Sequence, residues 1–304
     1  MARSFSIGRI ATLLATVLAA STLSLSAILV PERLNEWREA ERQRAVSAAV
    51  ATLGSALIEL SLERSLVQVT LQLPDPLAPQ HRAMIERQRN VAAAGFAEAL
   101  AGLRAVGTPE ARGLAADTEA RLAGLQVLRT TADAELTRPR TARDPAVLQR
   151  WSIGVPALIS AIENRRTTAR GAEDPVPGGV AIRDQIQHLA WSVREYGGRD
   201  RTYLAVALAL GAPLSAEALE QMAAFDGPVT RRLDALEAFG SHAALNPELQ
   251  AALRRLLNDY RDGYAGLRRS LIEASVAGRP YPVGFDAFFT CLLYTSPSPR
   301  DRQK

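Results

Sequence analysis

Cysteine and lysine are almost absent from this sequence of 304 residues. The single Cys291 excludes an internal disulfide, and it has no partners at the spacing of a metal site. The only lysine is Lys304, so the 36 basic residues are nearly all arginines, interspersed with Asp and Glu rather than gathered in a patch. The three histidines, His81, His188 and His242, lie far apart. We therefore expect no metal ion, no cofactor and no nucleic acid as partners.

Catalytic motifs and strand patterns are missing as well. The sequence contains no Gly-x-Ser-x-Gly, no His-Glu-x-x-His, no Walker loop and no Gly-x-Gly-x-x-Gly. We therefore expect a protein that is not an enzyme and has no catalytic residues. No stretch alternates apolar and polar residues for long enough to suggest a sheet, so the predicted fold class is all-α.

The last fourteen residues, 291–304, break with the rest of the chain. They read CLLYTSPSPRDRQK and contain both the only cysteine and the only lysine. Residues 291–301 resemble the translation of a common transposon-type sequencing adapter. We interpret 291–304 as an artefactual tail and leave it out of the fold prediction.

Residues 10–30 form an uncharged, mostly apolar run of 21 residues. As a helix, this run is long enough to cross a hydrocarbon core of roughly 30 Å. Two arginines precede it, so the positive-inside preference places residues 1–9 in the cytoplasm. A cleaved signal peptide with a cleavage site near residues 19–21 is the alternative, although signal cores are usually shorter, about 7–15 residues. We expect a single N-terminal span in a bacterial inner membrane, with the body in the periplasm.

From residue 31 onward the pattern is helical. The clearest apolar stripe has the alternating four- and three-residue spacing of a bundle seam; it consists of Val46, Val50, Leu53, Leu57, Leu60, Arg64, Val67 and Leu71. Proline, glycine and capping residues predict helices over 32–73, 78–106, 109–136, 145–170, 180–210, 215–240 and 247–276, with an eighth beginning near Phe285. Pro156 lies inside the fourth of these helices, where we expect a kink.

The chain also resembles itself at a distance. An offset of 137 residues aligns Glu63-Arg64 with Asp200-Arg201 and Pro76-Leu77 with Pro213-Leu214, and an offset of 139 aligns Leu128-Arg129 with Leu267-Arg268. Such a repeat predicts two copies of one helical unit. We expect a first antiparallel four-helix bundle over 31–172 and a second over 178–290. The second bundle is incomplete, because its fourth helix and a further membrane span are expected beyond residue 290.

Arg64 occupies a core position of the stripe, where a guanidinium is costly unless it is paired or meets an anion. Two interpretations stay open. The side chain reaches the bundle surface or pairs with a Glu of a neighbouring helix, or it points into a cavity and binds a small anion through its planar donor group. Arg201, its partner in the repeat, and the neighbouring Arg199 are the other candidate ligand-binding residues.

Two segments carry a resemblance to known families. Residues 60–73 (LSLERSLVQVTLQL) resemble the opening of nitrate- and nitrite-sensing domains, and residues 194–215 (REYGGRDRTYLAVALALGAPLS) are similar to extracytoplasmic segments of alphaproteobacterial methyl-accepting chemotaxis proteins. The resemblance covers about residues 45–285 and implies helical bundles upstream of cytoplasmic signalling modules. In the nitrate-sensing family, a neighbouring pair of arginines on the first helix holds the anion; here only Arg64 matches, and its neighbour is Glu63.

These observations predict the sensor region of a bacterial transmembrane receptor, with a methyl-accepting chemotaxis protein as the first candidate. We expect a homodimer that binds a small ligand, with anions such as nitrate or nitrite as one class, and signals through helix displacement. The alternatives are the sensor region of a membrane histidine kinase and a helical stalk or interaction module that binds no ligand. An unpaired Arg64 facing a cavity favours the sensor, and an Arg64 capped by a Glu favours the stalk.

Overall fold

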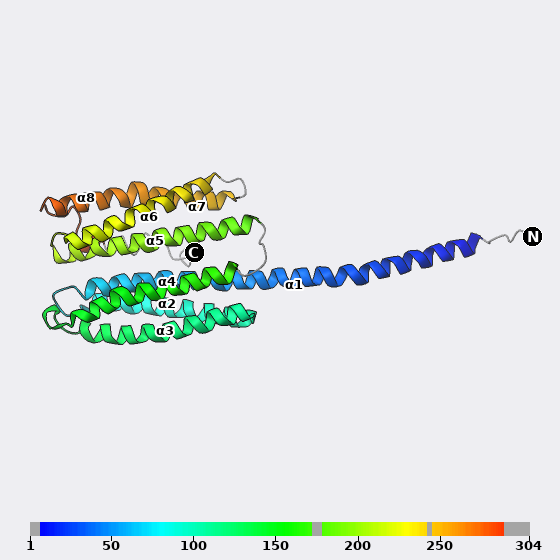
Figure 1. Cartoon of the computed structure of the whole chain (residues 1–304), viewed down its shortest axis with the longest axis horizontal. Coiled ribbons are helices and arrows are strands. Elements are labelled where there is room, and N and C mark those ends of the chain that lie inside the picture. Colours follow the sequence, from blue (N-terminus) through cyan, green and yellow to red (C-terminus); the bar gives the residue numbers. More distant parts are fainter. Residues whose placement is uncertain (1–6, 172–177, 242–244, 289–304) are drawn as a thin grey trace, which may run out of the picture.

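The computed structural model describes residues 7–171, 178–241 and 245–288, and helices account for all regular structure within these ranges (Figure 1). The α-helices are α1 (Ile7–Thr70), α2 (Pro79–Val106), α3 (Pro109–Leu136), α4 (Pro145–Gly171), α5 (Gly178–Leu210), α6 (Ala216–Gly240), α7 (Pro247–Asn258) and α8 (Ala265–Val276). A 3₁₀ turn (Arg140–Ala142) precedes α4, and a π-helical turn (Asp259–Tyr264) joins α7 to α8. The all-α prediction is confirmed for this part of the chain. The predicted tail at 291–304 and the segment 173–177 between the two predicted bundles lie outside it.

Helix boundaries follow the chemistry of the capping residues. The side chains of Thr108, Ser215 and Asn246 accept hydrogen bonds from the backbone N–H groups three residues later, at 3.2, 3.1 and 2.9 Å. Each of them satisfies one of the N–H groups that a helix start leaves free. At the other end of α2, Gly107 has a φ of 72°, a left-handed conformation that glycine adopts without strain. These boundaries agree with the predicted ones to within a few residues.

Two predicted boundaries are wrong. The apolar run at 10–30 and the predicted helix at 32–73 form one 64-residue helix, α1, which contains Pro31 and ends at Thr70. The predicted helix at 247–276 is interrupted by the π-helical turn, which inserts an extra residue into the helical repeat and realigns the side chains after it. Pro156 lies inside α4 as expected.

The predicted stripe on α1 is the core of the structure. All eight of its residues are buried, and five of them have no exposed surface. Glycines let α2 approach the same helix closely, because a Cβ added at Gly95 or Gly102 would lie 3.1 or 3.0 Å from the Cβ of Ala56 or Ala49. Apolar residues of α5, among them Leu204, belong to the same buried cluster, so the core continues from α1 into α5.

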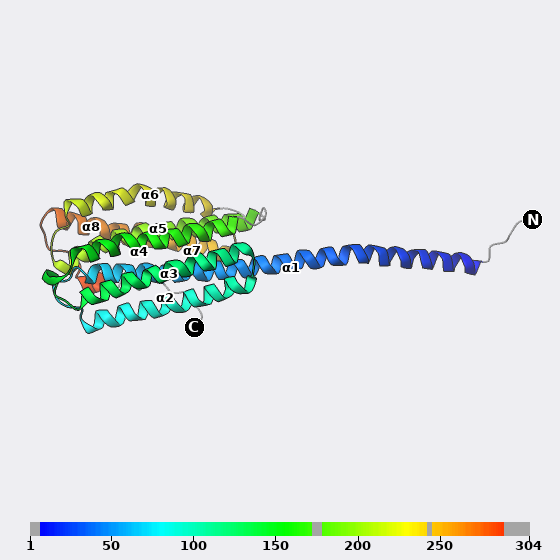
Figure 2. The same cartoon turned by 60° about the horizontal axis from the view of Figure 1, so that its bottom comes forward.

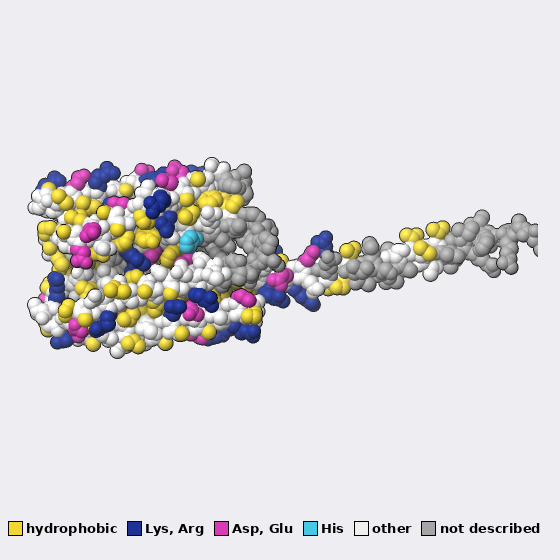
Figure 3. All heavy atoms as spheres, viewed as in Figure 1, with side chains coloured by type: hydrophobic (Ala, Val, Ile, Leu, Met, Phe, Trp, Pro, Cys, Tyr) yellow, Lys and Arg dark blue, Asp and Glu magenta, His cyan; other side chains and the backbone are white. Residues whose placement is uncertain are grey.

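Figures 1 and 2 show how the helices are arranged. The C-terminal half of α1 lies beside α2, α3 and α4, and α5 lies beside α6, α7 and α8. A second apolar cluster, which includes Val193, Val229 and Leu253, fills the space between α5, α6 and α7. On the face seen in Figure 3, acidic and basic side chains are dispersed among apolar ones, as expected for a solvated helical surface.

The N-terminal half of α1 projects far beyond the other helices (Figures 1 and 2). Its described apolar side chains are exposed, with Leu14, Val17 and Leu18 each more than half accessible. By length and composition, the part of this helix at Leu29–Thr70 is apolar enough to cross a membrane, and 39% of its most apolar 18 residues are buried. Because residues 32–44 carry many charges, these 18 residues coincide with the apolar stripe. Their apolar character therefore reflects the packed core.

The close contact between α1 and α2 gives a matched test. Gly102→Ala places a methyl group against Ala49, whereas the same change at Gly124, in α3, meets nothing within 4 Å. We expect Gly124→Ala to raise the free energy of unfolding by about 0.5–1 kcal/mol. Gly102→Ala should lower it by about 1–2 kcal/mol through overpacking. Urea unfolding of the full chain in neutral detergent, followed by circular dichroism, measures both; equal effects contradict the close approach.

Candidate functional site

Glu63 of α1 is a fully buried carboxylate held by two arginines. Arg129 of α3 donates from Nε and Nη2 to the two carboxylate oxygens at 2.9 and 2.6 Å, and Arg89 of α2 donates from Nε at 2.8 Å. Arg89 also makes a bidentate pair with Asp133 of α3, at 2.7 and 2.8 Å. A buried charge is tolerated when it is paired and hydrogen-bonded in this way. This Glu63 cluster joins α1, α2 and α3.

Asp200 of α5 has an equivalent set of partners. Arg268 of α8 donates to its two oxygens at 2.8 and 3.0 Å, and the Tyr264 hydroxyl donates to Oδ2. Burial, followed by the charge of Asp200, raises the pKa of Tyr264 well above 10. Arg268 also pairs with Asp226 of α6 at 2.9 Å. This Asp200 cluster joins α5, α6 and α8.

The two clusters correspond through the repeat. Glu63 and Asp200 are the pair aligned by the 137-residue offset, and Arg129 and Arg268 are aligned by the 139-residue offset. In both clusters the acid lies on the first helix of the unit and the arginine on the third, which in the second copy is divided by the π-helical turn into α7 and α8. The charge of the partner on the middle helix is reversed between the clusters: Arg89 aligns with Asp226 at the 137-residue offset. The aligned residues thus make equivalent contacts.

Arg64 points away from the Glu63 cluster and towards α5. It is 1% exposed, and its Nη1 donates to Oε1 of Glu195. Its backbone carbonyl accepts a 3.0 Å hydrogen bond from the indole of Trp151 in α4. Its other amino group, Nη2, has no hydrogen-bond partner among the described residues. A Cβ at Gly198 would lie 3.5 Å from this Nη2, in ordinary van der Waals contact, so the guanidinium packs directly against α5 at this position.

Glu195 collects three partners in the interface between α1 and α5. Besides Arg64, it accepts hydrogen bonds from Nε of Arg199 at 2.9 Å and from the Ser61 hydroxyl at 3.1 Å. Burial alone would raise the pKa of this carboxyl, but the charges of Arg64 and Arg199 and their hydrogen bonds outweigh burial, so the pKa is lowered. Glu195 is therefore an ionised link between the two helices.

Ser65 and Thr202 lie beside this link and hydrogen-bond to each other at 3.0 Å. They are also aligned by the 137-residue offset. Two equivalent residues touch only where the local symmetry axis between two copies passes, so the interface between α1 and α5 lies at such an axis.

Arg194 and Arg201 flank the same interface. The Arg201 guanidinium lies over the ring of Tyr264, 4.4 Å from its centre. The Nη2 atom of Arg194 is buried and has no hydrogen-bond partner among the described residues. Burial, with repulsion from Arg201, lowers the pKa of Arg194 to about 10, although Glu59 and Glu195 act in the opposite direction.

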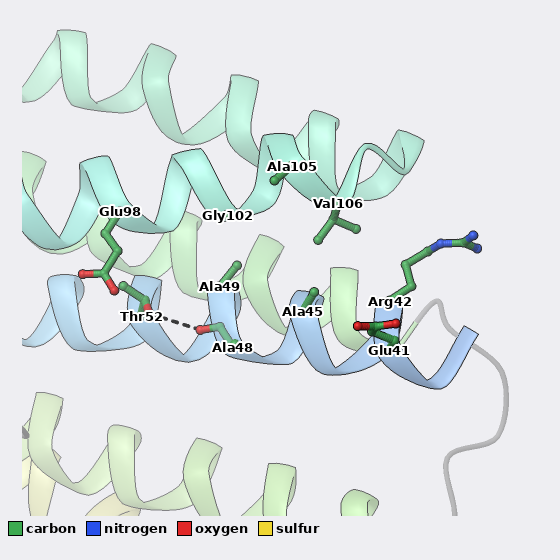
Figure 4. A pocket seen from close by; sticks show the side chains of 10 residues that line it. All are labelled: Glu41, Arg42, Ala45, Ala48, Ala49, Thr52, Glu98, Gly102, Ala105 and Val106. Atoms are coloured by element: carbon green, nitrogen blue, oxygen red, sulfur yellow. Dashed lines mark hydrogen bonds between the residues drawn. The ribbon is translucent and has the colours of Figure 1, made fainter. Parts of the chain in front are cut away.

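One open cavity of about 490 Å³ lies elsewhere, between α1 and α2 (Figure 4). Small side chains form its floor, and Glu41, Arg42 and Glu98 lie at its edges. None of the predicted ligand-binding residues lines it. It lies more than three helical turns from Arg64 along α1. The charge cluster between α1 and α5, formed by Arg64, Glu195 and Arg199, contains two of the predicted ligand-binding residues and is therefore the better candidate for a functional site.

The structure brings two of the three predicted ligand-binding residues together, because Arg64 and Arg199 share the carboxylate of Glu195. Arg201 instead lies over the aromatic ring of Tyr264, which belongs to the Asp200 cluster. Sequence analysis missed Glu195, which sits one helical turn before Arg199 in the quoted motif. It also missed Arg194, two turns before Arg201. Comparison with protein-family models, curated proteins and solved structures gives no match for this chain.

The lowered pKa of Glu195 predicts a dependence of stability on pH. A depressed pKa stabilises the fold above the ordinary value of 4.5, and this contribution is lost as the pH falls through the folded value. At pH 7, Glu195→Gln should cost about 3 kcal/mol, because it leaves the Arg64 charge uncompensated. That cost should begin to shrink below about pH 4.5, where the unfolded chain becomes protonated at this residue, and should vanish only below the lowered pKa of the folded state.

Urea unfolding at pH 7 and at pH 3.5–4 measures this difference. Glu119→Gln, which removes a half-exposed carboxylate, is the control and should follow the wild type at both pH values. A cost of Glu195→Gln that is the same at both pH values contradicts the assignment of an ionised, paired Glu195.

Proposed function

We propose that this chain is the extracytoplasmic input region of a bacterial transmembrane receptor, with residues 10–30 as its membrane anchor. The observation that carries the proposal is the continuity of α1. A single helix joins an exposed apolar segment to a core in which its own charged residues pair with three neighbouring helices. From Val30 to Glu63 this helix extends about 50 Å. A displacement of the core end is thereby carried towards the membrane.

We further propose that the body consists of two copies of one four-helix unit, the second incomplete. The matched Glu63 and Asp200 clusters support this, as does the contact between Ser65 and Thr202. At the 139-residue offset, the start of α4 at Pro145 corresponds to Gly284, and a helical turn begins at Phe285. The rest of that helix, and a second membrane span, are expected after residue 290.

The signalling step is a change in how α5 sits against α1. Arg64 and Glu195 form a buried salt bridge. A buried salt bridge is either formed or broken at a high cost, so the two helices shift between distinct packing arrangements and do not deform gradually. A small ligand that binds one arrangement better shifts the population towards it. A homodimer of such chains, coupled to a chemotaxis or histidine-kinase output, is the complete receptor that we envisage.

The second candidate is a helical stalk that binds no ligand. The pairing of Arg64 with Glu195 favours it, because a capped guanidinium in a filled seam needs no anion. Against it stands the Nη2 atom of Arg64, which is buried with no hydrogen-bond partner among the described residues. An unsatisfied buried donor costs about 1–3 kcal/mol, which a purely structural element gains nothing by keeping.

Cysteine labelling in cells tests the proposed topology. In a Cys291→Ser background, a cysteine is placed at Ser241, which is exposed, or at Ser4, before the apolar run. A membrane-impermeant maleimide should label Ser241→Cys once the outer membrane is permeabilised, and Ser4→Cys only after the inner membrane is lysed. The opposite pattern rejects the extracytoplasmic assignment.

The intact gene, sequenced from genomic DNA past codon 290, tests the receptor class. The proposal expects the remainder of the fourth helix, an apolar span of about 20 residues and then a cytoplasmic signalling region. A stop codon soon after the last bundle helix sinks the receptor proposal and leaves the stalk.

A further inference from the structure

One face of α5 is less covered than the equivalent face of α1. At the 137-residue offset, four of the five stripe residues from Val50 to Arg64 correspond to residues of α5 that are exposed or partly exposed. On α1 these four residues are at most 1% exposed. The aligned pairs are Val50 with Gln187, Leu53 with Ala190, Leu57 with Arg194, and Arg64 with Arg201. The described helices therefore leave the face of α5 that carries Arg194 and Arg201 partly open.

In the first unit, α4 covers this face. The indole of Trp151 donates to the backbone carbonyl of Arg64 at 3.0 Å, and Arg166, about four turns later in α4, packs against Gly54. Because the later residue of α4 meets the earlier residue of α1, the two helices are antiparallel. Helix α4 thus runs along the stripe from Arg64 back towards its start.

The chain reaches the equivalent position on α5 from the same end. The helical turn that begins at Phe285 follows a segment fixed beside the C-terminal end of α5, because the Tyr281 hydroxyl donates to the carbonyl of Ala212 at 2.8 Å. A helix that extends from this turn back along α5 is antiparallel to it, as α4 is to α1 (Figure 1). Such a helix passes Arg201 first and Arg194 about two turns later.

The charge on this face of α5 is not balanced by the described residues. Arg194 stands where the first unit has Leu57, and its Nη2 atom is buried with no hydrogen-bond partner among them. Arg201 has the ring of Tyr264 as its partner and no carboxylate salt bridge within the described ranges. Burial, with repulsion from Arg201, lowers the pKa of Arg194 although Glu59 acts in the opposite direction. A helix with acidic side chains complements this face.

We propose that the fourth helix of the second unit, expected after residue 290, docks on this face of α5 and places acidic side chains opposite Arg194 and Arg201. A carboxylate accepts two parallel hydrogen bonds from a guanidinium, so an Asp or Glu at each position satisfies the donors that the described residues leave without a partner. The carboxylate for Arg194 lies about seven residues after the one for Arg201. The inference rests on the proposed two-unit receptor and adds the partner of these two arginines.

Docking of this kind connects the two membrane spans of the proposed receptor. Arg194 and Glu195 are neighbours on α5, and Glu195 pairs with Arg64 of α1. Helix α1 contains the first span, and the fourth helix of the second unit leads into the second. A displacement of either helix is therefore transmitted to the other through two adjacent residues of α5.

The substitution Arg194→Leu, which installs the residue of the first unit, tests the docking in two proteins: the 304-residue chain and the product of the intact gene. Hydrogen exchange of the backbone amides of α5, measured by mass spectrometry in neutral detergent, reports local stability in both. In the 304-residue chain, exchange should slow by about fivefold or more, because the substitution removes a buried donor without a partner and a cation that Arg201 repels. In the intact protein, exchange should accelerate by about fivefold or more, because a carboxylate of the fourth helix then loses its partner.

The control Arg255→Leu removes an exposed arginine of α7 and should leave exchange in α5 unchanged in both proteins. In the intact protein, Arg194→Glu combined with an arginine at the facing acidic position should restore the wild-type exchange rate.

Slower or unchanged exchange of Arg194→Leu in the intact protein, as expected if water or a free anion meets this arginine, overturns the docking. Faster exchange in the 304-residue chain overturns it too, since Arg194 then has its partner within that chain. A fourth helix with no acidic residue on the face towards α5 removes this inference alone. A stop codon soon after codon 290 removes it together with the receptor proposal, so the two failures are distinguishable.

Discussion

Two adjacent residues of α1, Glu63 and Arg64, carry opposite charges into the interior and face different helices. Glu63 meets arginines of α2 and α3, and Arg64 meets a glutamate of α5. Successive residues of a helix point about 100° apart, so the two neighbours can contact different helices at the same height of α1. Because an unpaired buried charge costs several kcal/mol, each of these contacts fixes the rotation and height of α1 against its neighbours. The arrangement of the other helices depends on this pair.

The same constraint explains why the interface between α1 and α5 is polar within an otherwise apolar core. Glu195, Ser61, Ser65 and Thr202 form a hydrogen-bonded strip between two apolar clusters. Apolar seams tolerate sliding, since one leucine replaces another at little cost, whereas charge pairs and hydroxyl contacts have a defined register. The strip therefore sets one register for the two helices.

Sequence patterns predicted most of the helices because the signals for them are local. Proline at helix starts, capping side chains and the stripe on α1 specify ends and faces within a few residues. The π-helical turn at Asp259–Tyr264 was not predicted, since no local motif marks it; its Tyr264 hydroxyl donates to Asp200 of α5, a contact that the local sequence does not reveal. The repeat offset aligned Glu63 with Asp200 and Arg129 with Arg268. It could not show that Glu63 forms a salt bridge with Arg129, or Asp200 with Arg268. Glu195 was missed because its role depends on contact with Arg64 of α1, which lies 131 residues earlier in the sequence.

The pair of Arg64 and Glu195 couples α1 to α5, and a double-mutant cycle measures this coupling most directly. Arg64→Met, Glu195→Gln and the double variant are unfolded in urea at pH 7, beside the same cycle on Arg104 and Glu119, whose side chains are 55% and 44% exposed. We expect a coupling energy of about 2 kcal/mol or more for the buried pair. The exposed pair should give less than about 1 kcal/mol. If the effects of Arg64→Met and Glu195→Gln add to within about 0.5 kcal/mol, the pair does not couple the two helices and the account is wrong.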